Sequence, residues 1–165
     1  FAFGESYSAS VATYSAQNKG AGKMDRIIEG FRISIITMAA YSITLGFIIF
    51  MGAESIMKLF VTGEEIEVIK IGLEYLKIIS VLYILSNTNN VFQGLFRGIG
   101  KLRIPFWATF IQIFIRVALS YILSPYFGMK SVSYAIGTGW IIMLLFELTC
   151  YRKYFKKEIQ VGESV

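Results

Sequence analysis

Long apolar stretches alternate along the chain with short segments rich in charged residues. A helix that crosses a hydrocarbon core ~30 Å thick needs about 20 mainly apolar residues, because lipid offers no partner to backbone polar groups. Four stretches meet this requirement, and a fifth, at the start of the chain, is shorter and rich in Ser, Ala and Tyr. The pattern predicts an all-α, polytopic transmembrane helix bundle with about five crossings, at 1–17, 33–53, 73–96, 104–124 and 131–151.

The two ends of the chain lead to two further expectations. The sequence begins Phe1-Ala2-Phe3-Gly4, without an initiator Met or the basic segment of a signal peptide. We therefore expect the first crossing to be truncated, with its beginning missing from this sequence. At the other end we expect 158–165 to form a short, disordered cytoplasmic tail.

The composition favours a membrane protein over a soluble domain. Of the 165 residues, 55% are hydrophobic and 16% are charged, whereas soluble domains have about 45–50% and roughly 25%. Histidine is absent and Cys150 is the one cysteine. These counts exclude histidine-based catalysis, histidine metal sites, an internal disulfide and multi-cysteine metal clusters. We expect no cofactor and no enzymatic activity.

The basic residues gather on one side of the predicted membrane. If the crossings alternate in direction, one side carries Lys19, Lys23, Arg26, Arg32, Arg97, Lys101, Arg103, Arg152, Lys153, Lys156 and Lys157. The other side carries Lys58, Lys70 and Lys130. This asymmetry predicts a multi-pass protein of the cell membrane with a cytoplasmic C-terminus. The net charge of +5 does not indicate a nucleic-acid partner, because the basic residues lie in short clusters rather than in one patch.

An ionisable side chain inside a membrane span is costly, and it normally faces the protein interior or a water-filled cavity. Arg116 lies near the centre of its span, within a polar stripe at helical spacing formed by Thr109, Gln112, Arg116, Ser120 and Ser124. The stripe predicts either a helix that lines an aqueous or substrate cavity, or an arginine that joins two helices. Arg116 is not a proton carrier, because a guanidinium group does not deprotonate in proteins.

Glu5 lies about 12 residues before the end of its helix, which is ~18 Å at 1.5 Å per residue. That distance places it near mid-membrane, where a carboxyl group is a candidate site for a proton or a sodium ion. The alternative is that Glu5 is a fixed partner of Arg116 or of another basic group. We expect Glu74 and Glu147, which lie near the ends of their spans, to be solvated at the interface.

Polar residues also interrupt the helix predicted at 73–96. Ser86-Asn87-Thr88-Asn89-Asn90 are consecutive, and Tyr83, Asn87 and Asn90 fall on one helix face. Amide groups both donate and accept hydrogen bonds, so they suit contacts between helices or the wall of a polar cavity. The residues that we predict to line a substrate or ion pathway are Glu5, Tyr83, Ser86, Asn87, Asn90, Gln112, Arg116 and Ser120.

Two glycine-containing motifs precede predicted cytoplasmic loops. They are Ser15-Ala16-Gln17-Asn18-Lys19-Gly20-Ala21-Gly22-Lys23 and Phe96-Arg97-Gly98-Ile99-Gly100. In order and spacing they resemble helix ends of the multidrug and toxic compound extrusion (MATE) transporters, and the match covers roughly residues 1–157. Glycine permits the tight exit that a helix needs before a short loop. The helix-exit residues that the resemblance carries are Gln17, Asn18, Gly20, Gly22, Arg97, Gly98 and Gly100.

The resemblance implies that 1–157 is part of the C-terminal lobe of a two-lobe transporter with twelve crossings. The N-terminal lobe of the same chain would be its partner, together with the lipid bilayer. The implied function is the export of small organic cations or amphipathic drugs by sodium- or proton-coupled antiport with alternating access. One position departs from the family, because Ser86 stands where many relatives carry an acidic residue. A coupling-ion site would then depend on Glu5 or on the other lobe.

Three other functions fit parts of the pattern. A lipid-linked sugar flippase of the same broad fold would have a wide, strongly basic cavity, for which Arg116 alone is little support. An integral membrane enzyme would show a cluster of Asp, Glu or His with metal-ligand spacing. A membrane scaffold that does not transport would have no arginine at mid-membrane. Efflux by a MATE-like transporter is therefore the leading interpretation.

Overall fold

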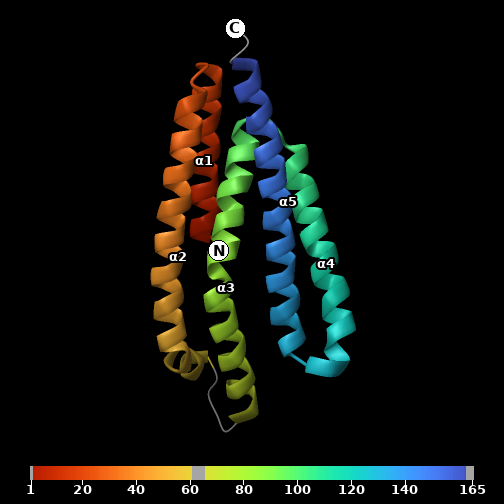
Figure 1. Ribbon diagram of the computed structural model, residues 1–165. Helices are drawn as coiled ribbons and strands as arrows, with labels where there is room; N and C mark the ends of the chain where they lie inside the picture. The colour runs from red at the N-terminus through yellow and green to blue at the C-terminus, as the bar shows by residue number, and fades with distance from the viewer. Residues whose placement is uncertain (1, 61–65, 163–165) are drawn as a thin grey trace.

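The computed structural model describes residues 2–60 and 66–162, and every element in them is an α-helix. The helices are α1 (Ala2–Gly20), α2 (Met24–Phe60), α3 (Ile66–Gly98), α4 (Arg103–Phe127) and α5 (Lys130–Gly162) (Figure 1). The prediction of an all-α bundle is confirmed. The helices α2, α3 and α5 extend beyond the predicted crossings. Residues at their ends, many of them charged, continue each helix past its apolar stretch.

The bundle has two different ends. The short connections after α1 and α3 lie at one end together with the end of α5, and we call this the basic end (Figure 1). The α2–α3 and α4–α5 connections lie at the opposite end, which we call the hairpin end. The helices α1, α3 and α5 therefore run parallel to one another. The start of α1 lies near mid-height of the bundle (Figure 1). The depth of Glu5 in a membrane stays a prediction.

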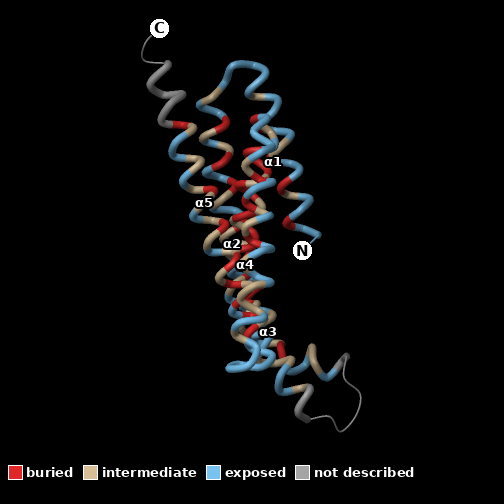
Figure 2. The backbone as a smooth tube through the Cα atoms, turned by 90° about the vertical axis from the view of Figure 1, so that its right-hand side faces the viewer, coloured by how far each residue is buried: buried red, intermediate tan, exposed pale blue. Residues whose placement is uncertain are grey.

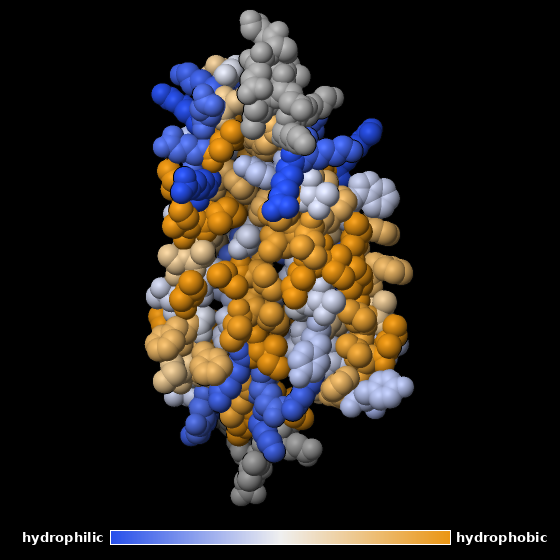
Figure 3. Space-filling model, viewed as in Figure 1, coloured by the Kyte–Doolittle hydropathy of each residue, from blue (hydrophilic) through white to orange (hydrophobic). Residues whose placement is uncertain are grey.

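The surface of the bundle is apolar between its two ends. Figure 3 shows a hydrophobic belt with hydrophilic groups above and below it. Large apolar side chains such as Phe47, Met51 and Phe114 are about two-thirds exposed, which suits contact with lipid. By length and composition, three helical segments among the described residues are apolar enough to cross a membrane: Met24–Lys58, Arg103–Phe127 and Lys130–Phe155.

The crossings predicted at 1–17 and 73–96 correspond to α1 and α3, which do not meet that criterion of length and apolarity. The reason for α3 is its position, because it contacts α1, α2, α4 and α5. Buried residues line the middle of the bundle around it (Figure 2). A helix that faces protein on most sides needs less apolar surface than one that faces lipid, and polar side chains on it find partners.

Small residues bring α1 and α3 into close contact. Gly94 and Gly98 stand four residues apart on α3, the spacing by which membrane helices approach most closely. A Cβ atom at Gly94 would lie 2.5 Å from the backbone oxygen of Ser8, and one at Gly98 would collide with the backbone oxygen of Ala12. The α1–α3 interface therefore depends on the absence of side chains at both positions.

An aromatic cluster fastens α2, α3 and α5 together near the basic end. The rings of Phe31 and Phe92 meet edge to face, with centroids 4.9 Å apart, and Phe31 stacks on Tyr151 at 5.0 Å. Phe31 and Phe92 belong to a larger buried apolar cluster that also contains Leu95, Phe96 and other residues of α1, α2, α3 and α5. Edge-to-face and offset contacts of this kind add about 0.5–1.5 kcal/mol each beyond area burial.

The two glycine motifs form the same turn. Gly22 and Gly100 have φ angles of 69° and 75°, in the left-handed region that favours glycine. After α1, the amide of Lys23 donates to the Asn18 carbonyl and that of Gly22 donates to the Lys19 carbonyl. The turn after α3 repeats both bonds with Lys101 and Gly100 as donors to Phe96 and Arg97. Each set of bonds is a Schellman motif.

The remaining residues of the two glycine motifs lie in the last turns of α1 and α3, where they make backbone and packing contacts. Gly20 and Gly98 are the last residues of α1 and α3. Outside its own helix and chain neighbours, nothing lies within 4 Å of a Cβ placed on Gly20, whereas Gly98 also packs against α1. The exit role of these two glycines stays a prediction. The amide of Asn18 donates to the Tyr14 carbonyl, and the carbonyl of Gln17 accepts a bond from Ala21. The ammonium group of Lys19 donates to the Ile99 carbonyl at 2.5 Å and joins the two turns.

The end of α5 differs from the sequence-based expectation. The helix continues to Gly162, into the segment predicted to be a disordered tail. Residues 163–165 lie outside the described part of the chain. Charged residues from Arg152 onward continue α5 past its apolar stretch. Because hydropathy marks only the apolar stretch, it predicted an end of the helix that is too early.

We expect Gly98→Ala to destabilise the bundle. The added Cβ would lie 2.6 Å from the Ser15 Cβ and collide with backbone of α1, and overpacking of this kind costs about 1–3 kcal/mol. The thermal midpoint of the intact protein in detergent should fall. Gly20→Ala is the control, because the space around that position is open. Equal midpoints for the two variants would contradict the close α1–α3 contact.

Candidate functional site

A polar cavity lies among α1, α3, α4 and α5. Its volume is about 340 Å³, and its described lining is Glu5, Tyr75, Ile79, Ser86, Asn90, Gln112, Arg116, Ile136 and Trp140. Five of these residues were predicted from the sequence as pathway candidates, and they come from three different helices. The structure therefore brings Glu5, Ser86, Asn90, Gln112 and Arg116 together in one place.

Glu5 and Arg116 bring opposite charges to this cavity without forming an ion pair with each other. Both residues are exposed. The sequence left open that Glu5 is a fixed partner of Arg116, and the geometry does not support that alternative. A carboxyl group and a guanidinium group that face one cavity without neutralising each other can each bind a group from outside.

Contacts between α1 and α3 set the position of Glu5. The absence of a side chain at Gly4 makes room for two amides, since a Cβ there would lie 2.5 Å from Asn90 Nδ2 and 2.6 Å from Asn87 Oδ1. One turn further along α1, the Ser8 hydroxyl donates to the Asn90 carbonyl at 2.5 Å. The Arg97 guanidinium donates to the same Ser8 oxygen at 2.9 Å. These bonds hold Glu5 beside Asn90.

The opposite wall of the cavity is held by the α4–α5 hairpin. Gly139 of α5 packs against Gln112 of α4, because a Cβ at Gly139 would lie 3.2 Å from the Gln112 backbone oxygen. Gln112 is buried, and Arg116 follows one turn later on the same face of α4. The polar stripe on α4 therefore points toward α3 and α5 at Gln112 and Arg116.

Three of the predicted pathway residues lie outside the described lining of this cavity: Tyr83, Asn87 and Ser120. Asn87 is 1% exposed, and its amide donates to the Ser42 hydroxyl of α2 at 2.8 Å. The Ser42 hydroxyl in turn donates to the Met38 carbonyl. Asn87 therefore joins α3 to α2, and Tyr83 is also buried. Helical spacing identified a polar face of α3 but did not show which neighbour each side chain meets.

Glu147 is buried, although its position near the end of a span predicted a solvated side chain. Its side chain is 0% exposed, and neither carboxyl oxygen has a hydrogen-bond partner among the described residues. The expectation that it is solvated at the interface is wrong. Glu147 continues a buried face of α5 through Gly139 and Met143 at intervals of four residues. That spacing is the sequence signal that would have identified it as buried.

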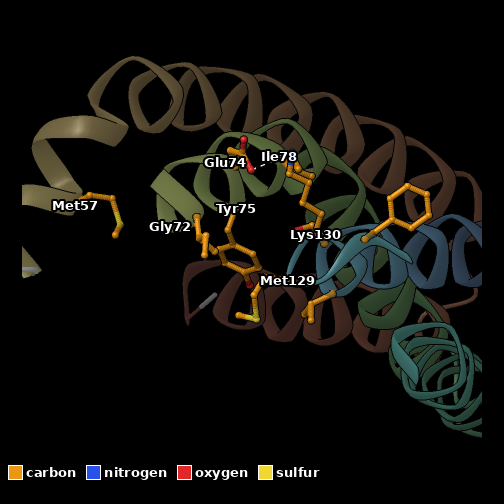
Figure 4. Close-up of a pocket in the computed structure, with 11 residues that line it drawn as sticks. Met57, Gly72, Glu74, Tyr75, Ile78, Met129 and Lys130 are labelled. Atoms are coloured by element: carbon orange, nitrogen blue, oxygen red, sulfur yellow. Dashed lines mark ion pairs between the residues drawn. The ribbon is translucent and has the colours of Figure 1, made fainter. Parts of the chain in front are cut away.

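A second, larger cavity lies at the hairpin end (Figure 4). Its volume is about 590 Å³, and the described lining is mostly apolar, with Met57 of α2, Ile78 of α3, Phe127 of α4 and Met129 near the start of α5. An ion pair of 3.1 Å between Glu74 of α3 and Lys130 of α5 also belongs to it. Tyr75 lines both cavities.

Metal binding by clustered acidic or sulfur ligands has no support in the described residues. No group of three or more His, Cys, Asp or Glu side chains there could hold a metal ion. The polar cavity offers one carboxylate together with hydroxyl and amide oxygens from Ser86, Asn90 and Gln112. These are the hard oxygen ligands that small cations prefer.

Comparison with known proteins gives consistent results. The MatE family model matches residues 1–122. The relative "Probable multidrug resistance protein NorM" of Thermotoga maritima is 26% identical over 131 residues, which cover 79% of this chain and 28% of the relative. A solved multidrug resistance MATE family transporter of the MOP superfamily, in an inward-facing conformation, is similar with a TM-score of 0.81 at 18% identity. That likeness covers 88% of this chain and 33% of the solved one, so the chain spans about a third or less of either protein.

Glu147 and Asn87 should respond in opposite ways to replacement by leucine. Glu147→Leu removes two buried oxygens that lack partners, and such a replacement is neutral or stabilising. Asn87→Leu breaks the bond to Ser42 and should cost about 1–3 kcal/mol. The thermal midpoint of the intact protein in detergent should rise or stay unchanged for the first and fall for the second. An equal fall of the thermal midpoint in both variants would contradict the view that Asn87 has a hydrogen-bond partner in the bundle and Glu147 has none among the described residues.

Proposed function

Since the chain belongs to the MatE family, we propose that it is part of a secondary transporter that exports small organic cations or amphipathic molecules. The observation that carries this proposal is the polar cavity inside a bundle with an apolar surface. Polar and charged residues are costly in hydrocarbon and are retained there for a pathway or a partner. In this bundle they face a cavity that is large enough for part of a drug-sized molecule.

The charges of the cavity assign roles to its residues. The Glu5 carboxylate attracts the positive group of a substrate or a coupling cation, and Asn90, Ser86 and Gln112 supply neutral hydrogen-bonding groups. Arg116 repels a cation from its side of the cavity and so directs it toward Glu5. The substrate and the coupling ion, Na⁺ or H⁺, compete for Glu5. Binding of one therefore releases the other, and this competition couples export of the substrate to entry of the ion.

The arrangement in the membrane follows from the charges at the two ends. The basic end carries Lys19, Lys23, Lys101 and Arg103, and we place it in the cytoplasm of a multi-pass membrane protein. A second lobe of the same protein would cover the polar cavity from outside this chain. Alternating exposure of the cavity to the two sides of the membrane would then move the substrate.

The two rival functions have less support. A lipid-linked sugar flippase needs a cavity with several basic groups, and the described lining here has Arg116 balanced by Glu5. A metal-dependent membrane enzyme needs a cluster of metal-ligating groups, and the described residues hold no group of three or more His, Cys, Asp or Glu that could bind a metal ion. We therefore do not assign an enzymatic activity to the chain.

Glu5→Gln should reduce coupled export by about tenfold or more, because the carboxylate is the one acidic group in the described lining of the cavity. The measurement is efflux of a fluorescent organic cation from proteoliposomes that contain the intact transporter, with an imposed sodium gradient or proton gradient. The gradient that drives export identifies the coupling ion.

Arg116→Gln tests the same cavity from the opposite wall and should also change export. Glu54→Gln is the matched control, because Glu54 is an exposed carboxylate paired with Lys58 at 2.7 Å, on α2, which contributes no residue to the described lining of the cavity. Normal export by both cavity variants, at normal protein levels, would remove Glu5 and Arg116 from the transport pathway.

A further inference from the structure

An open groove lies between α3 and α4 next to the basic end, and we call it the α3–α4 groove. Its volume is about 380 Å³. The described lining includes Gln93 and Arg97 of α3 and Pro105, Phe106, Phe110 and Ile113 of α4. None of these residues belongs to the described lining of the polar cavity or of the cavity at the hairpin end. The groove is therefore separate from the residues to which we assign transport.

The α3–α4 groove is basic at one end and apolar along its α4 side. Arg97 lies in the last turn of α3 and Pro105 in the first turn of α4, so both belong to the basic end. Phe110 and Ile113 follow Pro105 by about 8 and 12 Å along α4, at 1.5 Å per residue, and α4 runs toward the hairpin end (Figure 1). Phe106, Phe110 and Ile113 form the apolar wall of the groove. This wall extends from the basic end into the hydrophobic belt of Figure 3.

The guanidinium group of Arg97 is fixed in direction and keeps donors for a ligand. Its Nε donates to the Gln93 carbonyl at 3.3 Å, and its Nη2 donates to the Ser8 hydroxyl at 2.9 Å. These bonds use two of the five N–H donors that a guanidinium group has. Neither ion pair among the described residues involves Arg97, so no carboxylate there neutralises its charge. A guanidinium group in this state suits a phosphate, whose oxygens accept its hydrogen bonds in pairs.

We propose that the α3–α4 groove binds an anionic phospholipid from the leaflet at the basic end, with the phosphate on Arg97 and an acyl chain along the apolar wall. From the membrane surface inward, a phospholipid presents first a phosphate and then an apolar chain. The groove presents first a guanidinium group and then aromatic and aliphatic side chains, which is the complementary order. This binding requires neither Glu5 nor an exported substrate, so it goes beyond the proposed function.

The charges around the groove favour a headgroup with net negative charge. Lys101 follows Arg97 by four residues, and Arg103 precedes Pro105 by two. All three basic residues are exposed. They repel the choline group of a zwitterionic lipid and attract a headgroup that carries only the phosphate charge. The expected ligand is therefore an anionic lipid such as phosphatidylglycerol and not phosphatidylcholine.

The test compares two lipids with the same acyl chains on the intact transporter in detergent. Native mass spectrometry of a lipid titration gives the dissociation constants of phosphatidylglycerol and phosphatidylcholine. Each basic residue close to an anionic headgroup raises the affinity about fivefold. The unmodified protein should therefore bind phosphatidylglycerol about tenfold or more tightly than phosphatidylcholine.

Two groove variants separate the headgroup from the acyl chain. Arg97→Gln should lower the affinity for phosphatidylglycerol about fivefold or more and change that for phosphatidylcholine less. Ile113→Trp places a large ring on the apolar wall and should lower the affinity for both lipids. Lys153→Gln is the control for charge, because Lys153 is an exposed basic residue outside the described lining. Ile141→Trp is the control for size, because Ile141 also lies outside the lining and is 46% exposed, as Ile113 is.

Weaker binding of phosphatidylglycerol in both groove variants, with both controls unchanged, supports the proposal. Equal affinity of the unmodified protein for the two lipids overturns it. Equal losses in Arg97→Gln and Lys153→Gln also overturn it, because they indicate a general attraction to the basic end. Displacement of phosphatidylglycerol by inorganic phosphate assigns the groove to a free anion, which overturns it as well. Unchanged affinity in either groove variant means that the lipid lies elsewhere or that another part of the transporter covers the groove, and the proposal is then wrong.

The two groove variants protect the test against a loss of folding. Arg97→Gln removes the bond to Ser8 and can lower the stability of the α1–α3 contact. Ile113→Trp leaves that bond in place, so it decides the question when Arg97→Gln yields too little protein. None of these outcomes depends on export, which the Glu5 variant tests separately.

Discussion

Polar groups in the apolar part of this bundle need partners from the protein, because hydrocarbon supplies none. The helix richest in amides, α3, is the one that contacts all the others. The central position of α3 gives its amide-rich segment protein partners in place of lipid. Asn87 bonds to Ser42 of α2 and the Asn89 amide donates to the Trp140 carbonyl of α5, while the Asn90 carbonyl accepts from Ser8 of α1. These three bonds join α3 to three different helices, and the outward faces of α2 and α4 are left apolar.

The bundle consists of two units that meet at the polar cavity. The first consists of α1, α2 and α3. In it the parallel helices α1 and α3 are joined by glycine contacts, by the Ser8 bonds and by the Lys19–Ile99 bond between their similar end turns. The second is the α4–α5 hairpin, which contacts the first unit mainly through α3 and α5. Glu5 belongs to one unit and Arg116 to the other.

Hydrophobic and polar patterns predicted the helices and five polar residues that the structure brings to one cavity. The glycine motifs predicted tight helix exits, and the structure shows the left-handed residues of these turns at Gly22 and Gly100. Sequence patterns failed where the answer depends on neighbours. Spacing places Asn87 and Asn90 on the same face of α3, and Gly4 of α1 approaches both side chains. Only Asn90 lines the polar cavity, because the Asn87 amide bonds to Ser42 of α2. Distance from the end of a span suggested solvent for Glu147, whereas packing of α5 buries it completely. The apolar cavity had no sequence signal, because its lining comes from α2, α3, α4 and α5 and is assembled only when these helices pack together.

The ion pair between Glu74 and Lys130 connects α3 to the start of α5 at the hairpin end. The two side chains are 39% and 50% exposed, and pairs this accessible contribute at most about 1 kcal/mol. Dissolved salt screens such a pair and weakens it further. The attachment of the α4–α5 hairpin to α3 at this end therefore owes little to the two charges, and it should change only slightly with ionic strength.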